Sequence, residues 1–377
     1  DVERSRGLGD VYKRQTANGK IVIRNKNIKH GKIDFSSPSY TDDEHFAQRI
    51  KRAKPQPGDI IITREAPIGD VGMIPENTEC CLGQRMVLLR ANQSVCDNFY
   101  LLYSLQSLYV QHQISWSEGT GTTVSNLRIP HLEQIQIPYL PLEQQAKISS
   151  VLRALEEKIE NNRRLNDNLQ QQAAALFSSL YDRTNTEVRF TDLIQILGGG
   201  TPKTGENTYW NGNIAFFTPK DVGTPYTLIT EKTITEEGLS HCNSRLYPVN
   251  TVFVTARGTV GKVGMSGVPM AMNQSCYALV GKETHQLLVY FYTLKAVDRL
   301  KHKASGAVFD AITTRDFESE QIMKLSDDDA KAFLCIAEPM FQKVLNNCIE
   351  NLRLSTLRDS LLPKLMSGEI DVSSVHL

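Results

Sequence analysis

The sequence predicts an α+β protein with two similar, mixed strand-rich domains separated by long helices that pair as an antiparallel coiled coil. One observation is a long internal repeat: residues 57–73 (PGDIIITREAPIGDVGM) return about 192 positions later as residues 249–265 (VNTVFVTARGTVGKVGM). A repeat of this length exceeds the 20–50 residues of a solenoid unit, so it indicates a duplicated globular domain. The other observation is a long stretch of helical apolar spacing that follows each copy.

Length and composition limit the possible classes of protein. A chain of 377 residues with 40% hydrophobic content is long enough for two or three domains with their own cores. No apolar run or N-terminal pattern predicts a membrane span or a secretory signal. Seven cysteines without CxxC pairs, and dispersed histidines, indicate reduced thiols, no metal site and a cytoplasmic location. The 42 basic and 42 acidic residues give no net charge, so any nucleic-acid site requires segregated charge.

The first domain is predicted at residues 16–140. Residues 1–15 are polar and lack periodicity, so we expect them to be non-native and the domain to be truncated at its N-terminus. Short β-branched or apolar runs predict strands at 60–63, 71–74 and 85–89, and the Leu and Tyr spacing of 99–114 predicts a helix. A Gly/Ser/Thr loop at 119–123 and a strand at 135–138 complete the domain.

A long central helix is predicted at residues 141–183. Its apolar positions alternate steps of four and three residues, which is typical of a coiled-coil seam. The seam consists of Ile148, Leu152, Leu155, Ile159, Leu169, Ala173, Leu176 and Leu180. Asn162 and Asn166 interrupt it and are interpreted as register-setting residues. The alternative is an amphipathic helix that packs on its own domain.

The second domain is predicted at residues 184–326, followed by a distal helix and tail at 327–377. The seam of the distal helix consists of Phe341, Leu345, Ile349 and Leu352. Pro363 lies late in this helix, and Ser367 and Gly368 end it. Antiparallel pairing with the central helix would place one domain at each end of the pair.

Several short motifs, in this order and partly duplicated, resemble the specificity subunit of type I restriction–modification enzymes. They are GGTPK (199–203), YWNG (209–212), FTPKD (217–221), TARGTVGK (255–262), NQ (273–274), LPLEQQ (140–145) and LMSGEI (365–370). The resemblance covers residues 16–370. The first domain departs from the pattern, because it lacks the GGTP segment and the WNG turn.

The resemblance implies two target recognition domains, each reading one half of a bipartite double-stranded DNA sequence. It also implies that the paired helices dock modification (methyltransferase) subunits that carry S-adenosylmethionine, beside a restriction subunit that uses ATP and Mg²⁺. The helix residues expected at the docking surface are Leu152, Leu155, Ile159, Leu345, Ile349 and Leu352.

No catalytic motif is expected in this chain. Residues 258–263 (GTVGKV) lack the spacing of a GxxxxGK[ST] phosphate loop, and no base-methylation motif occurs. Thr63 and Thr255 have no histidine partner in the pattern, so their hydroxyls are expected to bind backbone or phosphate rather than to act as nucleophiles.

Repeated polar residues at the ends of predicted strands are the DNA-binding candidates. Arg64 follows a strand and is expected to be exposed, and Lys26 matches Lys220 of the second copy. Basic loop residues suit phosphate clamping or guanine contacts, and glutamines can pair with an adenine edge. The full set is Lys26, Arg64, Gln84, Lys203, Lys220, Arg257, Lys262 and Gln274. The alternative for each residue is a solvated loop side chain or a backbone contact.

Two other functions fit the same pattern. One is a protein-interaction scaffold with two binding modules on a coiled-coil rod and no DNA. The other is the recognition half of a fused restriction enzyme, which would require nuclease or methylase motifs.

Overall fold

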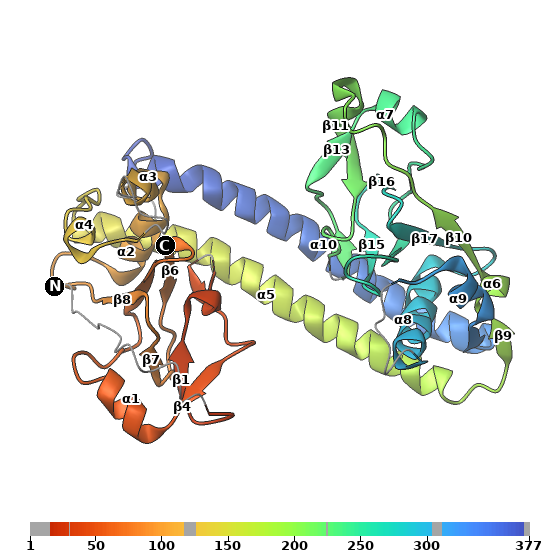
Figure 1. Ribbon diagram of the computed structural model, residues 1–377, viewed down its shortest axis with the longest axis horizontal. Coiled ribbons are helices and arrows are strands. Elements are labelled where there is room, and N and C mark those ends of the chain that lie inside the picture. The colour runs from red at the N-terminus through yellow and green to blue at the C-terminus, as the bar shows by residue number, and fades with distance from the viewer. Residues whose placement is uncertain (1–15, 30, 117–125, 224, 304–310, 373–377) are drawn as a thin grey trace. The chain divides into compact units, whose positions relative to one another are not determined.

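The computed structural model describes residues 16–29, 31–116, 126–223, 225–303 and 311–372. The chain divides into two compact units, one formed by residues 1–157 and 354–377 and the other by residues 158–353. Each unit contains one predicted globular domain together with part of both long helices (Figure 1). The predicted loop at 119–123 lies outside the described residues.

The first unit contains two small three-stranded sheets. One has the order β4-β1-β7 and the other β6-β5-β8. β-Branched side chains make β5 a buried central strand, since Ile60, Ile61 and Ile62 are almost fully buried. The strands are β1 (Lys20–Ile23), β2 (Ile28–Lys29), β3 (Lys32–Ile33), β4 (Ser39–Thr41), β5 (Ile60–Arg64), β6 (Ile68–Met73), β7 (Cys80–Leu82) and β8 (Met86–Leu89).

The second unit repeats these sheets and extends one of them. The sheet β13-β11-β16 corresponds to β4-β1-β7, and β15-β14-β17 corresponds to β6-β5-β8, with β12 and β10 added at its edges. The strands are β9 (Glu187–Arg189), β10 (Ile194–Gly198), β11 (Trp210–Phe217), β12 (Tyr226–Thr227), β13 (Lys232–Ile234), β14 (Val252–Thr255), β15 (Val263–Ser266), β16 (Met270–Met272), β17 (Cys276–Gly281) and β18 (Gln321–Met323).

Strand register shows that the sequence repeat is a structural repeat. Thr63 pairs with Met86 in the first unit, as Thr255 pairs with Cys276 in the second. Both units have a parallel strand pair at the matching place, β1 with β7 and β11 with β16, and in the second unit the added strand β12 is also parallel to β15. The prediction of a duplicated, mixed strand-rich domain is therefore confirmed.

Short helices also recur, with one difference. α1 (Asp43–Arg49) and α7 (Glu236–Ser240) begin after the capping side chains of Asp42 and Thr235. α8 (Gln286–Lys303) covers β15 and β17 in the second unit (Figure 1). In the first unit the predicted single helix 99–114 is instead α2 (Asn98–Gln106) and α3 (Leu108–Trp116). Ser107 separates them, because its backbone is extended and its hydroxyl donates to the Ser104 carbonyl.

The predicted strand at 135–138 is wrong, because these residues form no strand. Side chains satisfy part of their backbone: the Gln113 amide pairs with the N–H and C=O of Gln136, and the Tyr100 hydroxyl donates to the Pro138 carbonyl at 2.9 Å. In the second unit, by contrast, β18 is a strand because β9 supplies its partner. The other helices are α4 (Ile129–Leu132), α6 (Phe190–Leu193) and α9 (Thr314–Ser319), with 3₁₀ turns at Asn25–Asn27 and Asn207–Tyr209.

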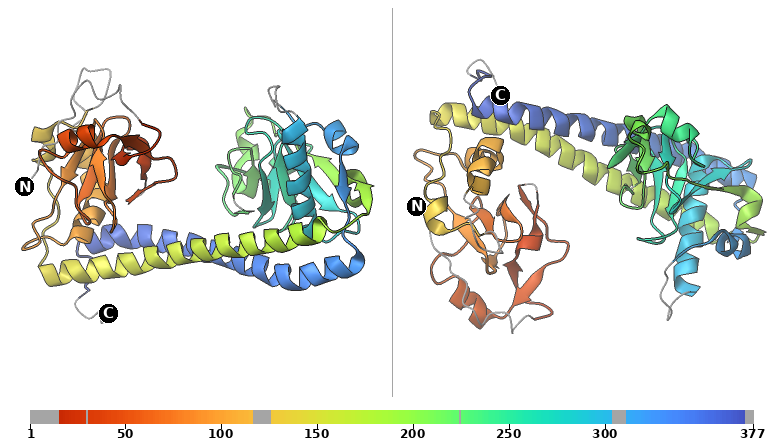
Figure 2. Two further views of the ribbon diagram at one scale, coloured as in Figure 1. Left: turned by 90° about the horizontal axis from the view of Figure 1, so that it is seen from below. Right: turned by 45° about the horizontal axis from the view of Figure 1, so that its top comes forward.

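The two long helices, α5 (Leu142–Tyr181) and α10 (Asp327–Met366), form the predicted antiparallel pair. Both views of Figure 2 show them side by side within each unit. In the first unit Ile148 and Leu152 of α5 pack with Leu365 and Met366 of α10. The same cluster includes Tyr100 and Tyr103 of α2, so this part of α5 packs on its partner helix and on its own domain.

A buried polar layer joins the two helices in the second unit. Asn162 donates from Nδ2 to Glu350 Oε2 at 2.8 Å and to Asn351 Oδ1 at 2.9 Å. Asn347 Nδ2 donates to Asn166 Oδ1 at 2.8 Å. Because Asn162, Asn166 and Asn347 are buried, a shifted register would leave their amides unsatisfied. Their interpretation as register-setting residues stays a prediction that this geometry supports.

An aromatic cluster fixes the helices to the second unit. The Phe177 ring of α5 stacks on Phe291 of α8, with ring centroids 5.0 Å apart, and meets Phe333 of α10 edge-on at 5.4 Å. All three side chains are almost fully buried. The core of this unit therefore includes both long helices.

The cysteines are free thiols. Burial raises the pKa of Cys81 to about 11 and the pKa of Cys276 to about 12. No helix within the described residues is long and apolar enough to cross a membrane.

The aromatic cluster makes Phe177 a sensitive position. Phe177→Ala should lower the free energy of unfolding of the second unit by about 3–5 kcal/mol, because it leaves a cavity among packed rings. Leu165→Ala, on the exposed face of the same helix, should change it by no more than about 0.5 kcal/mol. Hydrogen exchange of α8 amides in increasing urea measures both effects, and equal protection in the two variants would contradict this account.

Candidate nucleic-acid interface

Four segments of the first unit meet where strands β1, β5 and β7 end. Gly83 N donates to the Ile23 carbonyl at 2.8 Å, and Arg64 N donates to the Arg85 carbonyl at 2.8 Å. Leu127 N donates to the Arg64 carbonyl at 2.9 Å. Because β1 and β7 are parallel, their C-terminal ends lie at the same edge. We call residues 24–27, 64–67, 83–85 and 126–128 the first loop cluster.

The second unit builds the same arrangement with matching backbone hydrogen bonds. Asn273 N donates to the Phe217 carbonyl at 3.0 Å, and Ala256 N donates to the Ser275 carbonyl at 2.8 Å. Ile312 N donates to the Ala256 carbonyl at 2.9 Å. We call residues 218–221, 256–262, 273–275 and 311–313 the second loop cluster. The backbone of both clusters is thus fixed by one duplicated set of bonds.

A buried threonine braces the central loop of each cluster. Thr63 Oγ1 accepts from Asp70 N at 2.9 Å, and Thr255 Oγ1 accepts from Lys262 N at 3.0 Å. The Thr255 hydroxyl also donates to the Thr259 carbonyl. Both threonines are fully buried, so their hydroxyls bind backbone, as expected, and are not nucleophiles at a surface.

The first loop cluster contains a basic hollow of about 300 Å³. Two predicted residues, Lys26 and Gln84, line it. Its other lining residues are Val22, Arg24, Asn25, Arg49, Ala66, Gly83 and Arg85. None of these described residues is acidic, so the hollow attracts anions.

Arg64 does not have the exposed position that the sequence predicts. Its side chain is half-buried, and Nε donates to the Leu127 carbonyl at 2.7 Å while Nη2 donates to Asn126 Oδ1 at 3.0 Å. Arg64 therefore holds the 126–128 segment against the loop that follows β5. Residues 126 and 127 are distant in sequence, so a local pattern could not reveal this contact.

The second loop cluster contains four of the remaining candidates, Lys220, Arg257, Lys262 and Gln274. Lys220, Arg257 and Lys262 are exposed, and Lys220 forms an ion pair with Glu231 at 3.5 Å. The loops carrying Lys220 and Arg257 touch, since the Thr259 hydroxyl donates to the Pro219 carbonyl at 3.3 Å.

Gln274 and Lys203 belong to neighbouring turns of the same surface. The exposed Gln274 accepts a hydrogen bond from the Thr201 hydroxyl. Lys203, two residues after Thr201, is exposed, and its backbone carbonyl accepts a hydrogen bond from Trp210 Nε1 at 3.1 Å.

The sequence reasoning missed four basic residues. Arg24 and Arg85 border residues that were predicted, whereas Arg49 comes from α1 and donates to the Leu82 carbonyl at 3.0 Å. Lys301, at the end of α8, lies so close to Gly261 that a Cβ there would approach its Cε to 2.6 Å. The sequence offered a signal for two of them only, because Arg24 and Arg85 lie within two residues of the predicted Lys26 and Gln84 in the chain.

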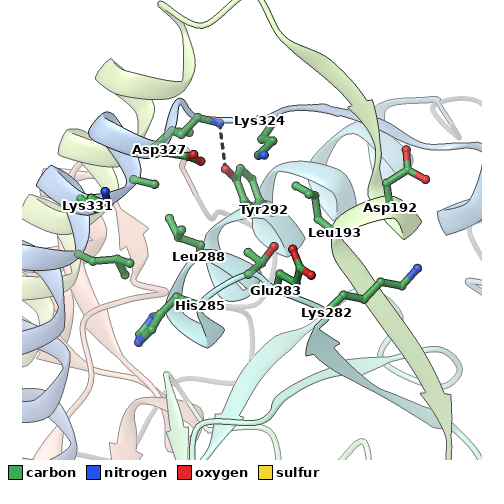
Figure 3. A pocket seen from close by; sticks show the side chains of 14 residues that line it. Asp192, Leu193, Lys282, Glu283, His285, Leu288, Tyr292, Lys324, Asp327 and Lys331 are labelled. Atoms are coloured by element: carbon green, nitrogen blue, oxygen red, sulfur yellow. Dashed lines mark hydrogen bonds between the residues drawn. The ribbon is translucent and has the colours of Figure 1, made fainter.

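A larger hollow of about 600 Å³ lies at the other end of α8 (Figure 3). It mixes Lys282, Lys324 and Lys331 with Asp192, Glu283 and Asp327. The Tyr292 hydroxyl in its wall accepts from Leu325 N at 3.0 Å. Balanced charge distinguishes this hollow from the basic one. In the part of the chain that the structure describes, no group of three or more His, Cys, Asp or Glu side chains could hold a metal ion.

The residues predicted for partner docking lie mostly inside the chain. Leu152, Ile159 and Leu345 are buried, and Leu155, Ile349 and Leu352 are half-buried. Leu152 belongs to the apolar core of the first unit, and Leu345 and Ile349 belong to that of the second, so a substitution at these positions acts on the packing of the helix pair. The large apolar side chains that the long helices expose are Leu142, Leu165, Ile336 and Leu357.

Comparison with known proteins agrees with this duplicated architecture. The family model described as the type I restriction modification DNA specificity domain matches residues 2–171 and 183–324. The first match includes residues 2–15, which lie outside the described residues.

Individual proteins are similar over most of the chain. The type I restriction enzyme MjaIX specificity subunit of Methanocaldococcus jannaschii is 23% identical over 345 residues, covering 84% of this chain and 79% of that protein. The putative MjaX specificity subunit of the same organism is 21% identical and covers 94% of this chain and 88% of its own length. The crystal structure of the type I restriction–modification S subunit from M. genitalium has the same fold, with a TM-score of 0.60, 17% identity and coverage of 97% of this chain and 93% of that one.

The threonine brace gives a test of loop construction. Thr255→Val keeps the side-chain shape but leaves Lys262 N without its acceptor, so it should cost about 1–3 kcal/mol of stability. Thr259→Val, at an exposed position of the same loop, should cost less than about 1 kcal/mol. Thermal unfolding compares the variants, and a Thr255→Val protein as stable as the wild type would show that the hydroxyl is not a brace.

Proposed function

The chain belongs to the family of type I restriction–modification DNA specificity domains, and we propose that each of its two loop clusters reads one half of a bipartite DNA sequence. The observation that carries this proposal is the duplicated backbone frame, which presents exposed cations at matching loops. Lys26 and Lys220 occupy equivalent positions in the repeat. Arg24, Arg49 and Arg85 line the same hollow as Lys26, and the loop that carries Arg257 touches the loop that carries Lys220.

Two kinds of DNA contact follow from this chemistry. Lysines at loop tips bind phosphates and position the duplex without reading its sequence. Arginine and glutamine side chains can form bidentate hydrogen bonds with guanine and adenine edges in the major groove. Gln84 and Gln274 belong to the second kind in this proposal, and Lys26, Lys203, Lys220 and Lys262 to the first.

The proposed assembly has separate partners for chemistry. We assign methyl transfer from S-adenosylmethionine to modification subunits and ATP- and Mg²⁺-dependent cleavage to a restriction subunit, and no catalysis to this chain. The modification subunits dock on the helix pair. Since the seam leucines are buried, the exposed Leu165 and Leu357 are better contact residues than Leu152 or Leu345.

A salt series tests DNA binding by the second loop cluster. In the complex with modification subunits, Arg257→Ala or Lys262→Ala should weaken binding to all duplexes and flatten the slope of log K against log salt by about one unit each, if each contacts a phosphate. Loss of preference at one base position would instead identify a base contact.

Lys331→Ala is the matched control, because Lys331 is exposed in the same unit but lines the charge-balanced hollow. Fluorescence anisotropy measures the three variants. If the Arg257 and Lys262 variants bind as the control does, the DNA site lies elsewhere, and the scaffold function without DNA becomes the better explanation.

Docking is tested with charges on the exposed helix face. Leu165→Asp should reduce copurification with the modification subunits by at least tenfold while the helix content stays unchanged, because Leu165 is 40% exposed. Gln171→Asp adds the same charge at another exposed position of α5 and should assemble normally. Leu152→Asp should lose assembly through unfolding of the helix pair, because it buries a charge. Assembly of Leu165→Asp at wild-type yield would exclude this face.

A further inference from the structure

We propose that Arg85, held by Glu65, reads a guanine in the half-site bound by the first loop cluster. This inference rests on the proposed function and adds a specificity-determining residue to it. Arg85 lies in the turn between β7 and β8, and its side chain is 49% exposed.

A chain of polar contacts orients this arginine. Arg85 Nε lies 3.1 Å from Glu65 Oε2, and the other Glu65 oxygen accepts from Asn126 Nδ2 at 2.8 Å. Asn126 is held in turn by Arg64 Nη2 at 3.0 Å. A carboxylate on Nε fixes the plane of the guanidinium and leaves its terminal nitrogens for a bidentate partner.

The surroundings favour a DNA base over a protein carboxylate as that partner. Arg85 borders the hollow lined by Arg24, Lys26 and Arg49, in which no described residue is acidic. These cations suit the phosphates that flank a base, and the arginine fork matches O6 and N7 of guanine.

Backbone conformation points to a role for the Arg85 side chain beyond structure. Arg85 has φ of +68°, in the left-handed region that favours glycine. The Arg85 guanidinium is half-exposed, and solvent screening reduces what its ion pair with Glu65 adds to stability, so stability is a weak reason for an arginine here. Strain of this kind is often found at functional sites.

The two loop clusters share their backbone hydrogen bonds but differ in the side chains at the positions of Arg85 and Glu65. In the second unit Ser275 takes the place of Arg85, and Arg257 takes the place of Glu65. The arginine thus comes from a different loop in each cluster. The two half-sites should therefore differ in sequence, and only the first should depend on the turn between β7 and β8.

Methylation sequencing of host DNA tests the proposal. The host carries the modification subunits with the wild-type chain, Arg85→Gly, Arg85→Lys or Glu65→Gln. Arg85→Gly removes the side chain and suits the positive φ, so the fold is retained. Arg85→Gly should lose roughly 5- to 150-fold discrimination at one guanine of one half-site, with the other half-site unchanged. Arg85→Lys should relax the same position, because lysine lacks the fork, and Glu65→Gln should relax it partly.

Controls separate this inference from the proposed function. Arg257→Ala should leave the guanine preference in the first half-site unchanged, whether it weakens binding to all duplexes or alters the opposite half-site. An unchanged motif in Arg85→Gly, or an equal loss of methylation at all sequences, would overturn the reading role while leaving DNA recognition intact. If Arg257→Ala and Lys262→Ala also leave methylation unchanged, the proposed DNA-binding clusters themselves are wrong. Arg85→Gly should unfold at the same midpoint temperature as the wild-type protein, which would show that altered specificity does not come from misfolding.

Discussion

The packing of α5 against α10 is the constraint on which both units depend. In the first unit, Leu152 and Leu365 share one cluster with Tyr100 and Tyr103 of the globular part. In the second, the Phe291 ring of α8 contacts both Phe177 of α5 and Phe333 of α10. Because the helices supply core surface to each sheet domain, the domains are not independent modules attached to a linker. A mutation in the helix seam therefore changes domain stability as well as any partner contact.

In the two loop clusters, the backbone is shared between the units, whereas the side chains differ. The same backbone hydrogen bonds and the same buried threonine hold the loops of both clusters. The side chains on those loops differ, with Arg85 and Glu65 in one cluster and Ser275 and Arg257 in the other. A duplicated frame with divergent loop residues lets one protein present two different recognition surfaces.

Charge segregation reconciles a neutral chain with a nucleic-acid partner. Many basic residues are matched locally along the helices, as in the pairs Lys158–Glu350, Arg153–Glu157 and Arg164–Glu160. The hollow of the first loop cluster, in contrast, has no acidic residue among the described residues that line it. Total charge is therefore a poor guide to this interface, and local charge at the loops decides the partner.

The sequence by itself determined the duplication, the strands of the repeated core and the antiparallel helix pair. These features are visible in local periodicity and in the similarity of one half of the sequence to the other. Both kinds of information are present in the sequence itself. It also placed Lys26, Gln84, Lys220, Arg257 and Lys262 at strand ends. Tertiary structure alone decided which arginines are available. Arg64 is tied to residues 126 and 127, and Arg49 reaches the hollow from α1. The strand predicted at 135–138 failed for the same reason, because a strand needs a neighbour that no local pattern specifies. Contacts between segments that are far apart in the sequence depend on the three-dimensional fold, and no local sequence pattern specifies them.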